Sequence, residues 1–221
     1  MKVHYFEQRT QEWFDIKQGK MSASNAANLI GTPAAFDKYV KKTAFQILKK
    51  PQDAEEEEYL PRSMQRGVDW EDWAYAELEK YLGQGIRVGF IEITDHFGIS
   101  PDFILDNFSV AGEIKVMEDE LMAMTLIDRK IPMKYFPQVL SYFLIDGVEK
   151  VVFCGFCPGL ETVNSKSIVK FIEVTKDMLV GEVSVVSSVK KGDMYVQEAL
   201  DELRYNIKKA GNLIEEYRKR L

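Results

Sequence analysis

The stretch from Ser100 to Lys115 (SPDFILDNFSVAGEIK) constrains the fold of this chain more than any other. The segments Ile99–Leu105 and Ser109–Val116 are rich enough in apolar residues to form strands. The pair Asp106-Asn107 between them is a turn signal of the kind that joins hairpin strands. The stretch therefore predicts a β-hairpin and, with it, a fold that contains a sheet.

The predicted hairpin brings two acidic residues together. A turn centred near Asn107 puts Asp102 directly opposite Glu113, with paired Cα atoms about 5 Å apart. Strand residues two apart face the same side, so Lys115 points where Glu113 points, whereas Ile114 points the other way, into the core. Like charges held opposite each other repel, so a proton, a cation or the nearby lysine must compensate them.

A divalent cation compensates such a pair of carboxylates most completely. Mg²⁺ prefers oxygen ligands, takes only one or two protein carboxylates and leaves its other positions for water and a substrate phosphate. Lys115 beside it would orient an attacking water and offset the charge that develops on a phosphate in the transition state. An Asp and a Glu-x-Lys on surface strands are also common as ordinary solvated residues, so the hairpin alone leaves both interpretations open.

The residues around the hairpin resemble those of a known family. Pro101-Asp102 followed by Glu113-Ile114-Lys115 is similar to the P-D…(D/E)-x-K signature of a large nuclease superfamily. Three further segments resemble, in order and spacing, the phage lambda exonuclease type, also called the viral recombinase or alkaline exonuclease family. These segments are Gln8–Ser24, Arg66–Glu71 and Tyr135–Tyr142. The resemblance covers roughly residues 8–145 and implies an α/β fold with a restriction-endonuclease-like core, a central mixed β-sheet flanked by helices.

The resemblance also implies roles for individual residues. Lys17 stands where the family has an arginine. A lysine cannot form the planar bidentate contact with phosphate that an arginine forms. Phe103 stands where the family usually has a glycine. From the sequence alone, Glu71 is equally well explained as a surface acid near a helix start, and Ser24 as part of a helix cap. The resemblance implies a metal site of Asp102, Glu113, Glu71 and the Ile114 carbonyl, catalytic roles for Lys115 and Gln138, and a 5′-phosphate site of Lys17, Ser24, Ser100 and Gln138.

The activity implied by the resemblance is 5′-to-3′ digestion of one strand of linear double-stranded DNA. Mg²⁺, with Mn²⁺ as substitute and two ions in the site, would support release of 5′-mononucleotides, leaving 3′ single strands for recombination. The implied partners are double-stranded DNA ends, a single-strand annealing protein and two further copies of the chain in a homotrimer ring. Two alternatives remain open: an endonuclease of the same superfamily, of the restriction or junction-cutting type, and a non-catalytic DNA-binding module.

Length and composition favour one nuclease domain spanning residues 1–221. The chain is 46% hydrophobic, contains no apolar run of 18 residues and begins without a signal peptide, so we expect an intracellular protein without membrane association. The resemblance implies the cytoplasm of a bacterial cell or phage-infected host. A net charge of −6 is unexpected for a DNA-binding protein. The run Asp53–Glu58 concentrates five of the acids, however, and lysines crowd the segment from Lys38 to Lys50.

The remaining segments predict helices and strands around the hairpin. The two cysteines, Cys154 and Cys157, lie in an apolar run and are expected to be core residues, because too few His and Cys residues accompany them for a zinc or iron–sulfur site. The apolar seam of the last helix is expected to pack on its own sheet or to join subunits. Helices are expected at Ser22–Ile30, Phe36–Lys50, Arg66–Leu82, Pro132–Ile145 and about Met194–Leu221, and strands at Ile86–Ile93, Val148–Cys157 and Ser167–Thr175.

Overall fold

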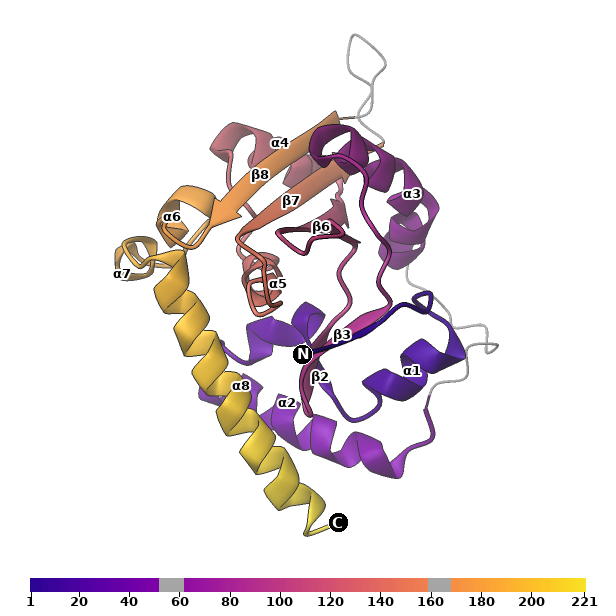
Figure 1. The fold of residues 1–221 in the computed structure, drawn as a ribbon. Coiled ribbons are helices and arrows are strands. Elements are labelled where there is room, and N and C mark those ends of the chain that lie inside the picture. The colour runs from indigo at the N-terminus through magenta and orange to yellow at the C-terminus, as the bar shows by residue number, and fades with distance from the viewer. Residues whose placement is uncertain (52–61, 159–167) are drawn as a thin grey trace.

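The computed structural model describes residues 1–51, 62–158 and 168–221 (Figure 1). The acidic run Asp53–Glu58 lies outside them. The described residues form two four-stranded sheets. The first has the order β1-β3-β4-β2, with β2 parallel to β4 and the other neighbours antiparallel. Its strands are β1 (Lys2–His4), β2 (Met21–Ser22), β3 (Phe90–Thr94) and β4 (Phe97–Ile99).

The second sheet carries the predicted hairpin. Its order is β5-β6-β7-β8, and it is mixed, because β6 and β7 run parallel while the outer pairs are antiparallel. In the hairpin, Phe103 pairs with Gly112 and Ile104 with Ala111, which confirms the predicted register. Its strands are β5 (Phe103–Ile104), β6 (Val110–Val116), β7 (Lys150–Cys157) and β8 (Ile168–Thr175).

Two of the expected strands are wrong in their extent. The segment Ile99–Leu105 is not one strand, because β4 ends at Ile99 in the first sheet and β5 begins at Phe103 in the second. Pro101 lies in the crossing between them and has no N–H to donate to a ladder, which disfavours a continuous strand there. In the segment Ile86–Ile93, only β3 is strand, and Ile86 forms an isolated bridge with Ile104.

Helices cover both faces of the second sheet (Figure 1). On one face, Ala74 and Leu78 of α3 pack with Ile114 and Cys154 in one buried cluster. On the other face, α5 packs against the sheet and buries Val139 in the main core. The helices of the described residues are α1 (Gln11–Lys17), η1 (Ala23–Asn28), α2 (Pro33–Phe45), η2 (Gln46–Leu48), α3 (Arg62–Leu82), α4 (Asp119–Asp128), α5 (Phe136–Tyr142), α6 (Val180–Val183), α7 (Val189–Gly192) and α8 (Val196–Arg218).

Local chemistry explains where several helices begin. Helix α5 starts only at Phe136, later than the expected Pro132, because Pro137 occupies its first turn. The segment Ser22–Ile30 is a short 3₁₀ helix, η1. Ser22 is the N-cap residue of this helix, but its side chain makes no capping hydrogen bond. Its hydroxyl lies instead 3.0 Å from the Ser24 hydroxyl.

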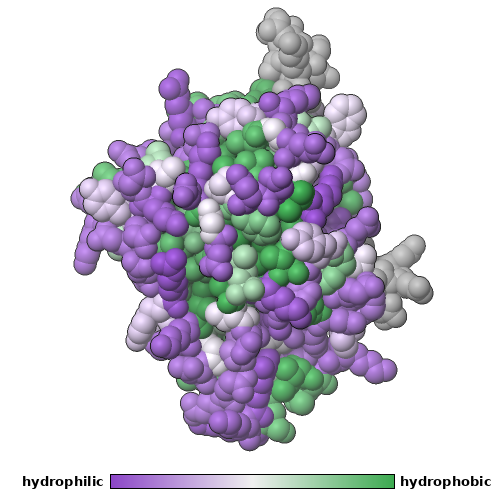
Figure 2. Space-filling model, viewed as in Figure 1, coloured by the Kyte–Doolittle hydropathy of each residue, from purple (hydrophilic) through white to green (hydrophobic). Residues whose placement is uncertain are grey.

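The seam of the C-terminal helix packs within the chain. Six apolar seam residues of α8 are buried in the main core, and the helix lies against α2 and α5. Figure 2 shows hydrophilic side chains along the outward side of α8 in this view, as expected for a helix that buries one stripe. The buried seam residues are Val196, Leu200, Leu203, Ile207, Ala210 and Ile214. In the part of the chain that the structure describes, no helix is both long and apolar enough to span a membrane.

Candidate active site

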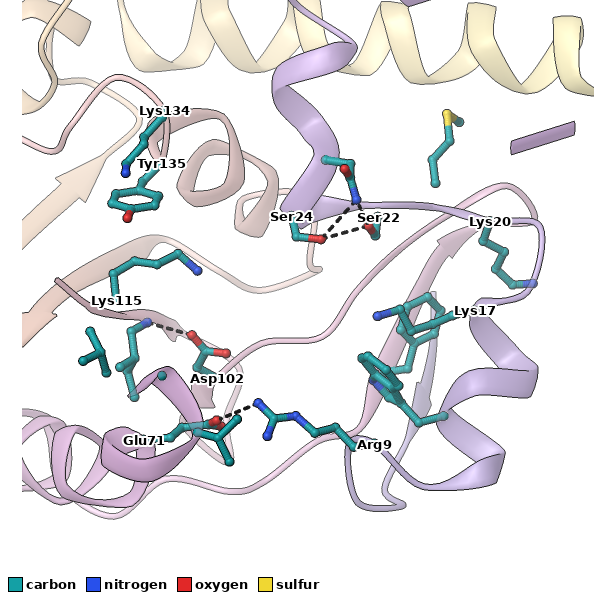
Figure 3. Close-up of a pocket in the computed structure, with 18 of the residues that line it drawn as sticks. Arg9, Lys17, Lys20, Ser22, Ser24, Glu71, Asp102, Lys115, Lys134 and Tyr135 are labelled. Atoms are coloured by element: carbon teal, nitrogen blue, oxygen red, sulfur yellow. Dashed lines mark hydrogen bonds and ion pairs between the residues drawn. The ribbon is translucent and has the colours of Figure 1, made fainter. Parts of the chain in front are cut away.

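A pocket of about 1050 Å³ lies between segments that belong to the two halves of the fold, and most of the predicted site residues line it (Figure 3). It is lined from one side by α1, β2 and η1, and from the other by α3 and the end of β6. Of the predicted residues, Lys17, Ser24, Glu71, Asp102, Ile114 and Lys115 line it.

Asp102 lies at the point where the chain enters β5. Its Oδ2 accepts a hydrogen bond of 2.7 Å from the backbone N–H of Ile114, so the carboxylate is held against the neighbouring strand. The ladder register, continued by one residue, sets Asp102 opposite Glu113. Burial, and then the charge of Glu113, raise the pKa of Asp102 well above its ordinary value. The expected repulsion between the two carboxylates is therefore present.

Glu113 is fully buried, with no exposed surface. Its Oε2 accepts a hydrogen bond from the Tyr142 hydroxyl, and its Oε1 forms an ion pair with the Lys115 ammonium. Burial lowers the pKa of Lys115, but the charges of Glu113 and Asp102 outweigh that effect and leave the pKa above its ordinary value. Lys115 is therefore a permanent cation at this site.

Tyr142 is the residue that sequence reasoning missed. Burial raises the pKa of its hydroxyl well above the ordinary value, and the charges of Glu113 and Asp102 act in the same direction. The group consequently stays a protonated donor. A signal existed in the sequence, because Tyr142 follows Gln138 by four residues, which places both on one face of a helix. Gln138 makes a side-chain hydrogen bond to the Tyr142 hydroxyl.

Glu71 reaches the pocket from α3 and is joined there by Arg9. The Arg9 guanidinium donates a hydrogen bond of 3.3 Å to Glu71 Oε2, and Figure 3 shows the two side chains meeting below Asp102. Arg9 has a left-handed backbone, with φ 67°, which is uncommon for a residue other than glycine. Next to it, the Gln8 side chain donates a hydrogen bond of 3.1 Å to the Pro101 carbonyl. The segment that carries Arg9 is thereby tied to the one that carries Asp102.

The donors at this end of the pocket suit a hard divalent cation in chemical type. Asp102, Glu71 and the Ile114 carbonyl offer oxygen, and the carboxylate of Glu113 keeps free lone pairs beside its contacts with Lys115 and Tyr142. A cation would also relieve the repulsion that raises the pKa of Asp102. Within the described residues, no three Asp, Glu, His or Cys side chains are grouped closely enough to hold a metal by themselves. Mg²⁺ typically takes only one or two protein carboxylates, so a pair is sufficient.

The opposite wall of the pocket is basic and rich in hydroxyl groups. The Lys17 ammonium lies 3.2 Å from the centroid of the Trp13 ring, and burial lowers the pKa of Lys17 to about 8. Trp13 Nε1 donates a hydrogen bond of 2.9 Å to the Ser100 hydroxyl. Ser100 and Gln138, which we expect at the phosphate site, are not among the described residues that line the pocket. Ser100 contacts Trp13, which lines the pocket, and Gln138 contacts Tyr142, which does not.

Charge is distributed unevenly over this chain. Six basic residues line the pocket, against three acidic ones, a formal excess of three positive charges in a chain whose net charge is −6. Because bound nucleic acid is held largely by contacts between cations and phosphates, the local excess is more informative than the total. The basic residues are Arg9, Lys17, Lys20, Lys42, Lys115 and Lys134, and the acidic ones are Glu71, Asp102 and Glu118.

Comparison with known proteins gives both a family and a fold. The model of the YqaJ-like viral recombinase domain matches residues 12–149. An alkaline exonuclease from Laribacter hongkongensis is 21% identical, with a TM-score of 0.69 over 96% of this chain and 97% of that chain. The same enzyme in complex with dAMP gives 22% identity, with the same TM-score and coverage. A phage-related exonuclease from Haemophilus somnus 129PT is 12% identical, with a TM-score of 0.57 over 89% of this chain and 94% of that chain.

These likenesses confirm the fold class. The expected α/β architecture, a restriction-endonuclease-like core with a mixed sheet flanked by helices, is shared with solved structures over nearly the whole chain. No curated protein matches the chain significantly.

Proposed function

The chain belongs to the family of YqaJ-like viral recombinase domains, as its motifs predicted, and from this premise we propose that it is a metal-dependent nuclease that digests one strand of linear duplex DNA from the 5′ end. One observation carries this proposal: Asp102 and Glu71 with Lys115 on one side, and the basic wall with Lys17 on the other, line a single pocket. The first group suits phosphodiester hydrolysis, and the second suits a terminal phosphate.

The acidic end of the pocket would hold the metal. Asp102, Glu113, Glu71 and the Ile114 carbonyl are the proposed ligands. We propose two bound Mg²⁺ ions, with Mn²⁺ as a substitute. They would supply a Lewis acid that lowers the pKa of water and stabilises a departing 3′-oxygen. Pocket volume agrees with this assignment, since about 1050 Å³ accommodates a nucleotide as well as hydrated ions.

Protein side chains supply the remaining electrostatics. Lys115, held by Glu113, offers a fixed positive charge close to Asp102, where it would orient an attacking water and offset the negative charge of the transition state. Tyr142 holds the other oxygen of Glu113 and thus prevents that carboxylate from turning. Since these contacts exist before substrate binds, little reorganisation is needed during the reaction.

The basic wall would receive the 5′-terminal phosphate. Lys17 lines the pocket beside Ser22 and Ser24, and their hydroxyl groups contact each other at 3.0 Å. An ammonium and two hydroxyls are donors suited to phosphate oxygens. Ser100 is joined to this proposed subsite through Trp13, whose ring lies against the Lys17 ammonium. Gln138, which we also assign to the subsite, contacts Tyr142 and through it Glu113 at the metal end.

The wider assembly is part of the same proposal and rests on the resemblance to the phage lambda exonuclease type. A ring of three copies would enclose the duplex, and a single-strand annealing protein would take up the 3′ strand, in the cytoplasm of a bacterial cell or phage-infected host. Figure 2 shows hydrophilic side chains along α8 in this view, and the apolar seam of the helix is buried within the chain.

Digestion of linear and closed circular duplex tests the proposed function. Linear duplex with 5′-phosphoryl ends should be degraded in Mg²⁺ and should survive in excess chelator. Closed circular duplex should survive under both conditions, whereas an endonuclease would cut it. Linear duplex with 5′-hydroxyl ends should be degraded about tenfold more slowly, because one charge-assisted phosphate contact contributes about 1.5–3 kcal/mol and Lys17 lacks the bidentate geometry of arginine. Equal rates on the two kinds of end would argue against 5′-phosphate recognition.

A further inference from the structure

The C-terminal end of α8 lies against the loop that joins α1 to β2. Arg218 Nη2 donates a hydrogen bond of 2.7 Å to the Gly19 carbonyl, although the two residues are 199 positions apart. The Arg218 side chain is only 21% exposed. Gly19 has a left-handed backbone, with φ 69°, and a Cβ added there would lie 2.8 Å from Arg218 Nη2 and 2.9 Å from Ile47 Cγ2. The loop can approach Arg218 this closely because Gly19 has no side chain.

A second set of contacts joins the same helix end to His96, in the turn between β3 and β4. Glu215 Oε1 lies 3.2 Å from Arg218 Nη1 and 3.3 Å from His96 Nε2. The His96 carbonyl accepts a hydrogen bond of 2.8 Å from the N–H of Met21. Gly211 allows the His96 ring to pack on α8, since a Cβ there would lie 3.0 Å from the ring. The end of α8 therefore contacts the loop directly at Gly19 and also contacts His96, whose carbonyl bonds to Met21 at the end of the loop.

The loop has a third anchor on the side of α2. The Gln18 side-chain amide donates hydrogen bonds to the Gln46 carbonyl and, at 3.0 Å, to the Lys49 carbonyl. Gln18 is thus held by η2 and by Lys49, which follows it, and Gly19 is held by α8.

The other edge of this loop is the basic wall of the pocket. Lys17, Lys20 and Ser22 all line the pocket within three residues of Gly19, and Figure 3 shows Lys17 and Lys20 on the side of the pocket away from Lys115. Arg218 itself does not appear among the described residues that line the pocket. Its guanidinium therefore acts on the wall through the backbone of the loop.

We propose that Arg218 is a positioning residue for the basic wall: by holding the Gly19 carbonyl, it keeps Lys17 and Ser22 in the geometry that binds the terminal phosphate. The C-terminal turn of α8 thus supports the substrate site from outside the pocket, although it lies beyond residues 12–149 that match the family model. This inference rests on the proposed function only for the identity of the anion. The mechanical part, that Arg218 orders the loop, is independent of it.

The mechanical part is tested without DNA. Hydrogen exchange of residues 18–22 should become about tenfold faster or more in Arg218→Ala, because exchange reports local opening, while exchange in β7 stays unchanged. Arg218→Lys should lie between the wild type and Arg218→Ala, since an ammonium can donate to one carbonyl but lacks the guanidinium fork. Arg220→Ala is the matched control, because Arg220 is 66% exposed and forms an ion pair with Glu216 of α8. Unchanged exchange at residues 18–22 in Arg218→Ala would overturn the proposal.

Binding in chelator, where no cleavage interferes, tests the link to substrate. Arg218→Ala should bind 5′-phosphoryl duplex about tenfold more weakly and 5′-hydroxyl duplex as the wild type does. An equal loss on both duplexes would show a general electrostatic effect and would overturn the positioning role. A wild type that binds both duplexes equally would contradict the proposed 5′-end recognition instead, and the exchange experiment would still decide the role of Arg218.

A second variant covers the case in which Arg218→Ala fails to fold. Gly19→Ala introduces a Cβ at a left-handed backbone position and pushes against Arg218 from the loop side. It should produce the same faster exchange at residues 18–22 and the same selective loss of affinity for 5′-phosphoryl duplex. A Gly19→Ala protein that exchanges and binds as the wild type does would contradict the proposal.

Discussion

The Tyr142 hydroxyl donates a hydrogen bond to Glu113, a carboxylate with no exposed surface. Tyr142 lies on α5 and Glu113 on β6, so this contact joins the helix layer to the hairpin that carries the acidic residues. With Lys115 on the other oxygen, it leaves the carboxylate little freedom to rotate. A buried charge that loses one of its partners is costly, which makes this pair a suitable place to test the site.

Tyr142→Phe removes the hydroxyl and leaves the ring. We expect the cleavage rate to fall about tenfold or more and the protein to lose about 1–3 kcal/mol of folding free energy, because a buried carboxylate loses a donor. Single-turnover rates and chemical denaturation measure the two effects. Tyr205→Phe is the control, since Tyr205 is 67% exposed. An unchanged rate in Tyr142→Phe would mean that the Tyr142 contact does not orient Glu113.

Asp102→Asn should abolish cleavage without destabilising the metal-free protein. Because burial and Glu113 raise the pKa of Asp102, the folded state holds this proton more tightly than the unfolded state. Below the ordinary carboxyl pKa, protonated Asp102 does not oppose folding. As pH rises through the raised pKa of the folded state, the protein loses folding free energy, because the carboxyl group must then ionise in the buried site. The variant should melt at the same or a higher temperature than the wild type at neutral pH without metal, with a weaker dependence on pH. A large fall in melting temperature would contradict the repulsion between Asp102 and Glu113.

Addition of Mg²⁺ should raise the melting temperature of the wild type and have little effect on Asp102→Asn. A ligand that binds only the folded state stabilises it by mass action, by about 2.7 kcal/mol at a hundredfold excess over its dissociation constant. Ca²⁺ and Na⁺ at equal ionic strength separate specific binding from screening. The assignment of Asp102 as a metal ligand fails if both proteins respond equally to Mg²⁺.

Lys115→Ala should affect the rate far more than binding. One phosphate contact is a small part of DNA affinity, whereas a preorganised charge in the transition state typically contributes a factor of about a hundred or more. Single-turnover kinetics and binding in chelator measure the two quantities separately. The variant should also lose stability, because Glu113 is buried and Lys115 is its counter-ion. Equal losses in rate and affinity would reduce Lys115 to a binding residue.

Recognition of the 5′-phosphate should weaken as pH rises through about 8, because burial lowers the pKa of Lys17 to about 8 and the neutral amine no longer attracts the anion. We expect the ratio of affinities for 5′-phosphoryl and 5′-hydroxyl duplex to fall between pH 7 and 9 in the wild type. In Lys17→Ala the ratio should be low and constant. A ratio that is independent of pH in the wild type would exclude Lys17 from the phosphate site.

The sequence by itself determined the local features of this protein. The register that sets Asp102 opposite Glu113 follows from the position of one turn, because a hairpin pairs residues at equal distances from its centre. Burial of Ile114 on the opposite side follows from strand alternation, and the buried seam of α8 follows from helical periodicity. Each of these depends only on residues close together in the chain.

Tertiary structure alone decided the contacts that join distant segments. Sequence periodicity carries no information about which side chain meets Glu113 from another layer, so Tyr142 was missed. The change of sheet between Ile99 and Phe103 was missed as well, since apolar patterning is the same whether a strand continues or crosses over. The contact of Arg218 with Gly19 spans 199 positions, and it exists because packing of α8 on α2 brings the last turn of the chain to the wall of the pocket.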